Sequence, residues 1–190
     1  MVTTGKGLIL LDPGHGGTDP GAISLSPLEL HESEINMEIV AKLQDILTVS
    51  GYEVHCTRKA DVAVPLSQRA RLTAQLNPDI FISVHCNASD NKSANGTETL
   101  YRDDNDIELA TCIQDELVRA LGTKNRGVRN DVTYLKKRLA VLNTLPIPSC
   151  LVEVAFISNS ADAVILLDTY LIAKAISAGV DQWFISRNIV

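Results

Sequence analysis

The chain has 190 residues, of which 45% are hydrophobic, and its 17 lysines and arginines against 23 aspartates and glutamates give a net charge of −6. This length allows one well-filled core and is short for two domains, so we expect a single domain over residues 1–190 with its core at 7–186. The acidic balance argues against a nucleic-acid partner, which requires a basic face. No apolar run approaches the ~18 residues of a membrane-spanning helix, so no membrane insertion is expected.

The first half of the chain predicts strands that alternate with helices. Four apolar residues at 8–11 indicate a strand buried on both faces, and His15 follows it in a turn between glycines. A long surface loop is expected from Thr18 to Leu30. We expect Ser33 to cap a helix that stops at Gly51. Glu32 then stands at the N-terminal edge of this helix, where the helix dipole favours a carboxylate whatever its role.

The remaining elements continue this alternation. We expect a short strand at 52–58, a helix that begins at Pro65, and a buried strand at 79–87 that carries His85 near its end. A strand at 96–101 and a helix at about 106–121 follow. The stretch 125–140 is interpreted as irregular and locally basic. A buried strand at 149–156 contains Glu153, and a helix at about 170–185 closes the chain. This order is typical of a parallel α/β sheet.

Two histidines at strand ends and one carboxylate at a helix start are the candidate metal ligands. The carboxyl ends of neighbouring parallel strands share one edge, so His15 and His85 can converge there, with Glu32 as a third ligand. Two imidazoles and a carboxylate, with one position left for water, are typical of a catalytic zinc site. Glu153 is the candidate proton carrier, because burying a lone carboxylate in an apolar strand costs free energy, which is expected only where the group is catalytic or ion-paired. A salt bridge from Glu153 to Arg69 or Arg126 is the open structural alternative.

Several separated motifs resemble the catalytic domain of the zinc-dependent N-acetylmuramoyl-L-alanine amidases, often called the third amidase family. These motifs, in chain order, are DPGHGGTDPGA at 12–22, ESEIN at 32–36, LSQRA at 66–70, FISVHCNA at 81–88, NRGV at 125–128 and LVEVAFISN at 151–159. The resemblance implies one α/β domain with a mixed, mostly parallel sheet flanked by helices on both faces. It implies that His15, Glu32 and His85 bind one Zn²⁺ per chain and that Glu153 is the catalytic carboxylate.

The activity implied by the resemblance is hydrolysis of the amide between the lactyl group of N-acetylmuramic acid and the L-alanine of peptidoglycan stem peptides. A zinc peptidase that cuts within the stem peptide and a non-catalytic wall-binding domain are the alternatives. Action at the bacterial cell wall is implied. The opening MVTTGKG lacks the charged and apolar regions of a signal peptide, which fits a phage-type endolysin or a domain excised from a secreted autolysin. Nothing in the sequence indicates an oligomeric state.

The chain also departs from the family pattern at several positions. Ser33 stands where a lysine is common, and Asn143 and Leu145 replace an arginine and a threonine. His31 and Glu34 flank Glu32, but the motif register assigns the ligand position to Glu32 in preference to either neighbour. The stretch from Thr133 to Arg138, with its lysines 136 and 137, looks inserted; contact with an anionic wall polymer is one interpretation, and a solvated loop is the simpler one.

Neighbours of His85 and the cysteines complete the expectations. Asn87 is a candidate to orient His85 by a hydrogen bond in the second coordination shell. Cys86 is expected to point to the opposite face of its strand and pack in the core. The four cysteines form no C-x-x-C pair, and we expect free thiols rather than a disulfide framework.

Overall fold

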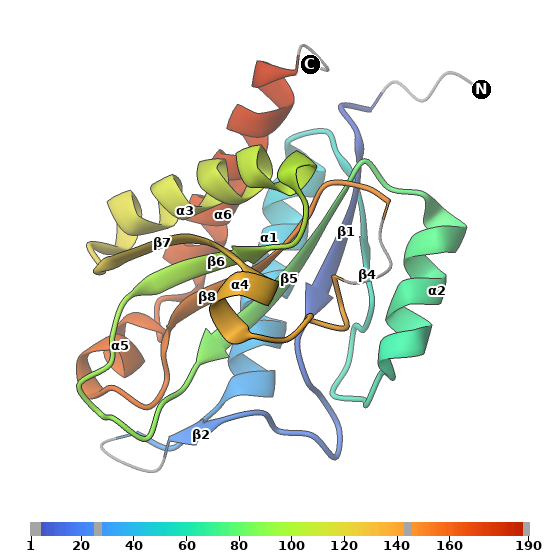
Figure 1. Ribbon diagram of the computed structural model, residues 1–190. Coiled ribbons are helices and arrows are strands. Elements are labelled where there is room, and N and C mark those ends of the chain that lie inside the picture. Colours follow the sequence, from blue (N-terminus) through green and yellow to red (C-terminus); the bar gives the residue numbers. More distant parts are fainter. Residues whose placement is uncertain (1–4, 25–27, 143–145, 188–190) are drawn as a thin grey trace.

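A six-stranded sheet in the order β4-β1-β5-β8-β6-β7 forms the centre of the computed structural model (Figure 1), which describes residues 5–24, 28–142 and 146–187. Strands β4, β1, β5 and β8 are parallel, whereas β6 runs antiparallel to β8 and parallel to β7. The strand bounds are β1 (Leu8–Pro13), β4 (Glu53–Cys56), β5 (Ile80–Asn87), β6 (Thr97–Tyr101), β7 (Asn125–Asn130) and β8 (Ser149–Phe156). The expected single α/β domain with a mixed, mostly parallel sheet is confirmed.

Helices cover both faces of this sheet, because the apolar residues of the inner strands alternate between the faces. On β1, Ile9 and Leu11 join the larger core cluster, and Leu10 joins a smaller one on the opposite face. The larger cluster contains the buried sides of α1 (Glu32–Val49), α3 (Ile107–Leu121) and α6 (Thr169–Ser186). The smaller cluster packs against α2 (Leu66–Leu76) and α4 (Asp131–Leu135). We call this second side the α2/α4 face.

Two sequence predictions of local structure are wrong. Ser33 is not the N-cap of α1, because the helix already begins at Glu32 and His31 occupies the cap position. The stretch 125–140 is not irregular throughout, because it contains β7 and the short helix α4. Strand β7 escapes a pattern-based prediction because it is an edge strand whose polar residues are only partly buried.

Smaller elements complete the chain. The surface loop contains a two-stranded antiparallel pair, β2 (Ile23–Ser24) and β3 (Leu30–His31). A 3₁₀ turn, η1 (Asp104–Asp106), precedes α3, and α5 (Ser160–Ile165) precedes α6. The family departures noted at Asn143 and Leu145 lie outside the described residues. Among the described residues, no helix is long and apolar enough to cross a membrane.

Candidate functional site

His15, Glu32 and His85 come together at the carboxyl edge of the parallel strands. His15 follows β1, Glu32 opens α1 and His85 lies near the end of β5. Nε2 of His15 lies 3.2 Å from Oε1 of Glu32, and Nδ1 of His85 lies 3.0 Å from the same oxygen. One potential ligand atom from each residue falls within 4.8 Å of the others. Two imidazoles and a carboxylate so arranged can hold a metal ion.

The carboxylate of Glu32 is fixed from both sides by main-chain amides. Its Oε1 accepts a hydrogen bond from the backbone N–H of Cys86 at 3.1 Å, and its Oε2 accepts one from Ala22 at 2.9 Å. Burial would raise the pKa of this carboxyl, but the hydrogen bonds from His15 and His85 outweigh burial and hold the pKa well below its usual range. Glu32 is therefore a permanent, pre-oriented negative charge at the centre of the cluster.

His15 is held in a left-handed backbone conformation, with φ of 61°. Two buried arginines bind the main chain on either side of it. Arg58 donates to the carbonyls of Pro13 and Gly14, at 3.0 and 2.9 Å. Arg69 donates to the carbonyl of Pro13 at 3.1 Å and to that of His15 at 3.1 Å. These bonds stabilise a conformation that non-glycine residues seldom adopt.

The second nitrogen of His15 also has a partner. Its Nδ1 lies 2.9 Å from Oδ2 of Asp19, so the ring is fixed at both nitrogens. The hydrogen bond to Glu32, followed by the charges of Glu32 and Asp19, raises the pKa of His15 to about 9 despite partial burial. A carboxylate on the far nitrogen is the usual means of orienting a metal-binding imidazole.

The absence of side chains at two glycines makes room for the side chains of His15, Glu32 and His85. A Cβ on Gly14 would lie 2.2–2.6 Å from three atoms of the His85 ring. A Cβ on Gly21 would lie 2.6 Å from Oε2 of Glu32 and 2.8 Å from Cδ2 of His15. The glycines of the DPGHGGTDPGA motif are therefore required by the approach of the ligands as well as by the turn.

Glu153 lies next to His85 on the neighbouring strand. The two residues are register partners between β5 and β8, so their side chains point to the same α2/α4 face of the sheet. Oε2 of Glu153 is buried and has no hydrogen-bond partner in the described part of the chain. Burial first, and then the charges of Glu32 and Glu98, raise the pKa of Glu153 well above its usual range.

The structural alternative for Glu153 is wrong. Arg69 is ion-paired with the buried Asp12, and Arg126 pairs with Glu98 at 2.9 Å. Within the described residues neither arginine contacts Glu153, which leaves a partly buried carboxyl beside the histidine cluster with its Oε2 unpartnered. Such a group is a candidate for proton transfer.

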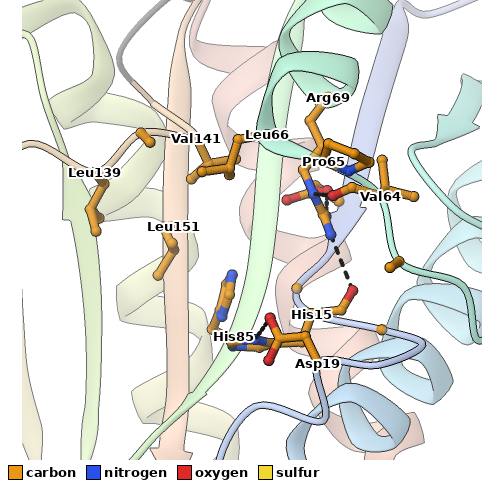
Figure 2. Close-up of a pocket in the computed structure, with 15 residues that line it drawn as sticks. His15, Asp19, Val64, Pro65, Leu66, Arg69, His85, Leu139, Val141 and Leu151 are labelled. Atoms are coloured by element: carbon orange, nitrogen blue, oxygen red, sulfur yellow. Dashed lines mark hydrogen bonds and ion pairs between the residues drawn. The ribbon is translucent and has the colours of Figure 1, made fainter.

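A pocket of about 490 Å³ opens over the cluster (Figure 2). His15 and His85 line one end of it, and the segment at the start of α2 faces the segment 139–141 across it. The apolar lining residues that Figure 2 labels are Val64, Pro65, Leu66, Leu139, Val141 and Leu151. The pocket can therefore take a ligand with alkyl groups next to the group that meets the histidines.

The other residues named from the sequence lie outside the cluster. His31 pairs loosely with Glu34, 3.8 Å away, and neither residue joins the metal-binding set. Cys86 is buried on the opposite face, as expected. Asn87 donates its side-chain amide to Oε1 of Glu98 at 2.7 Å and accepts from the backbone N–H of Ala88 at 2.8 Å, so these bonds direct its side chain away from His85. All four cysteines are free thiols.

Sequence reasoning missed Arg58 and Asp19. Arg58 follows a short strand in a stretch without any motif, and its partners are main-chain carbonyls, so nothing in the sequence pattern identifies it. Asp19 lies inside the DPGHGGTDPGA motif, and its spacing of four residues from His15 was the available signal.

Comparison with known proteins decides the family. A family model described as N-acetylmuramoyl-L-alanine amidase (Amidase_3) matches residues 9–182. The chain belongs to this family. It is 38% identical to the N-acetylmuramoyl-L-alanine amidase LytC of Bacillus subtilis over 82% of this chain and 30% of LytC. The chain therefore spans less than a third of the length of that curated relative.

Solved amidase structures share the fold of this chain over most of its length. The amidase AmiC2 of Nostoc punctiforme is 32% identical, with a TM-score of 0.86 over 94% of this chain and 97% of that one. The CwlD amidase of Clostridioides difficile is 32% identical, with a TM-score of 0.85 over 95% of this chain and 99% of that one. The shared fold thus covers 94–95% of this chain, and the family match covers residues 9–182.

Proposed function

We propose that this chain is a zinc-dependent hydrolase of the amide between the lactyl group of N-acetylmuramic acid and the L-alanine of peptidoglycan stem peptides. The observation that carries the proposal is the convergence of His15, Glu32 and His85, beside Glu153, in a member of an amidase family. One catalytic domain over residues 1–190, acting at the bacterial cell wall, is part of the proposal.

The donor set of the cluster fits zinc. Imidazole nitrogens and a carboxylate oxygen suit Zn²⁺, whereas Ca²⁺ or Mg²⁺ sites are built mainly from oxygen ligands. We assign His15, Glu32 and His85 as the ligands of one Zn²⁺. A zinc ion bound there would polarise the lactyl carbonyl and lower the pKa of a water to about 7.

Glu153 is proposed as the catalytic carboxylate. Its unpartnered Oε2 would take the proton that the attacking water gives up and pass it to the nitrogen of the leaving alanine. The raised pKa of Glu153 suits this role, because a carboxyl that binds a proton more readily than usual can hold that proton and then act as the acid in the second step. The pKa of the neighbouring Glu32, lowered first by the hydrogen bonds from His15 and His85, keeps that carboxylate ionised and out of the proton transfer.

Digestion of purified peptidoglycan with and without a chelator tests the proposal. We expect new alanine amino termini and intact glycan strands that carry lactyl carboxylates, and we expect neither after chelation. New amino termini from residues further along the stem peptide would indicate a peptidase instead. Binding to the wall without any new end group would indicate a non-catalytic domain.

The Glu153→Gln variant tests the assignment of roles. We expect hydrolysis to fall by at least about a thousandfold while the zinc content stays near one ion per chain. Loss of zinc in this variant would contradict the proposed division, because Glu153 would then be a ligand. Elemental analysis of the purified variant decides between the two outcomes.

A further inference from the structure

Arg129 presents a guanidinium group whose Nε forms a long ion pair with Glu98 and no hydrogen bond within the described residues. It lies on the edge strand β7, and its side chain is 39% exposed. The guanidinium stacks on the ring of Tyr134 with its Cζ 4.6 Å from the ring centroid. Its Nε lies 3.7 Å from Oε2 of Glu98, beyond hydrogen-bond distance. In the described part of the chain this Nε is buried without a hydrogen-bond partner. A stacked, oriented guanidinium of this kind is suited to bind a carboxylate.

The neighbouring arginine shows that Glu98 does not need Arg129. Arg126 donates to Oε2 of Glu98 at 2.9 Å and to the hydroxyl of Tyr134 at 3.0 Å. Glu98 is buried and also accepts from Asn87 and Tyr134, at 2.7 and 3.1 Å. One carboxylate thus faces two guanidinium groups. Glu98 therefore has its hydrogen bonds from Arg126, Asn87 and Tyr134 without any from the Nε of Arg129.

The surroundings of Arg129 favour an external anion. A hollow of about 380 Å³ lies against it, between β7 and α4, and is lined by Tyr101, Val128, Arg129, Asn130, Thr133 and Tyr134. Three exposed cations, Lys136, Lys137 and Arg138, follow directly in the chain.

The register of the sheet connects this hollow to the proposed catalytic residues. His85 on β5 pairs with Glu153 on β8, and Glu153 pairs with Glu98 on β6. Leu100, two residues after Glu98 and therefore on the same face of the sheet, pairs with Arg129 on β7. His85, Glu153 and Glu98 therefore form one row across the α2/α4 face, and Arg129 lies on the same face in the adjacent row, with its Nε 3.7 Å from Oε2 of Glu98.

The role of Glu153 gives the direction of the substrate along this row. Glu153 delivers its proton to the leaving alanine nitrogen, so the stem peptide departs on the β8 side of the histidine cluster and continues over β6 and β7. Three strand intervals of about 4.8 Å each separate β5 from β7, and an extended peptide covers about 3.4 Å per residue. The long side chain of Arg129 reduces the distance that the peptide must cover between β5 and β7. The second or third residue of the stem peptide therefore reaches Arg129.

We propose that Arg129 binds a carboxylate on the second or third residue of the stem peptide and makes this chain prefer acidic stem peptides to amidated ones. This inference rests on the proposed function, because the direction of the peptide is taken from the role of Glu153. Arg129 acts here as a specificity-determining residue, distant from the bond that is cleaved.

Binding of the released peptide tests this proposal without turnover. The probes are the tripeptide L-Ala-γ-D-Glu-L-Lys and its twin in which both free carboxylates are amides, titrated calorimetrically into the zinc-loaded chain. We expect the wild type to bind the acidic peptide about tenfold more tightly than the amide, as for a charge-assisted hydrogen bond. We expect Arg129→Gln to reduce this ratio to below about twofold. The control is Lys137→Gln, which removes one exposed positive charge from the same segment.

The control variant should keep the wild-type ratio. The proposal is overturned if Arg129→Gln retains the preference, if Lys137→Gln loses it equally, or if neither peptide binds to the wild type. Digestion of peptidoglycan is assayed separately for alanine amino termini. Absence of those termini would refute the amidase activity, while the ratio of the two binding constants still decides on Arg129.

Discussion

Replacement of Gly14 by alanine tests whether empty space beside His85 positions the proposed zinc ligands. Gly14 does not adopt a positive φ, so its backbone conformation is open to alanine. The nearest obstacle among the described residues is the ring of His85. A Cβ at Gly14 would lie 2.2 Å from Cε1, 2.4 Å from Nε2 and 2.6 Å from Nδ1 of that ring.

The size of the effect follows from these distances. Cβ atoms do not approach other heavy atoms more closely than 3.0 Å, so the ring must move by at least 3.0 − 2.2 = 0.8 Å. Metal–ligand distances tolerate about 0.2 Å, so the displacement is about four times that tolerance. We expect the affinity for Zn²⁺ to fall by about a hundredfold or more, and the free energy of unfolding by about 1–3 kcal/mol from overpacking.

Competition with a chromophoric chelator measures the zinc affinity, and urea unfolding of the metal-free protein measures the stability. Gly5→Ala is the matched control, because among the described residues its Cβ would meet the carbonyl oxygen of Gly51 alone, at an ordinary 3.5 Å. The control should bind zinc as the wild type does. Zinc affinity of Gly14→Ala within about twofold of the wild type would refute the crowding argument.

Three further predictions concern the residues that hold the cluster. The metal-free protein should lose stability as the pH rises from 6.5 to about 9, because folding raises the pKa of His15 from 6.5 to about 9 and the stabilising protonated ring loses its proton over this range. Urea unfolding at several pH values in this range measures the effect, and a free energy of unfolding that does not change with pH would contradict it. Asp19→Ala should weaken zinc binding by about 10–100-fold without loss of the fold, as measured by chelator competition. Arg69→Lys should lower the free energy of unfolding by about 3 kcal/mol, whereas Arg71→Lys, exposed on the same helix, should change it little.

Much of the fold and the candidate cluster could be predicted because the relevant residues lie on strongly patterned elements. Buried parallel strands such as β1 and β5 appear as continuous apolar runs, and their ends share one edge of the sheet. His15 and His85 stand at two such ends, so their convergence follows from topology alone. Their joint arrangement with Glu32 is confirmed, whereas the metal-binding role of the three residues stays a prediction.

The remaining features could not be predicted for identifiable physical reasons. Strand β7 lies at the edge of the sheet, so its sequence NRGVRN needs no apolar alternation. The start of α1 was misplaced because the main-chain conformation, and no side-chain cap, decides where the helix begins. Arg58 acts on carbonyl oxygens, which every residue carries, so no side-chain pattern reveals its partners.

The buried arginines indicate that folding, and not the metal, sets the geometry of the His15 turn. A non-glycine residue at φ of 61° raises the free energy of the folded state by about 1–3 kcal/mol. Arg58 and Arg69 donate four hydrogen bonds to carbonyls 13–15, and each contributes about 1.5–3 kcal/mol of stability, which offsets this cost. Oε1 of Glu32 is held independently by the amide of Cys86. We therefore expect the chelated protein to keep its circular dichroism spectrum and to rebind zinc without a slow refolding phase in stopped-flow mixing. Loss of the spectrum on chelation, or a slow phase that matches the refolding rate, would show that the metal itself organises the turn.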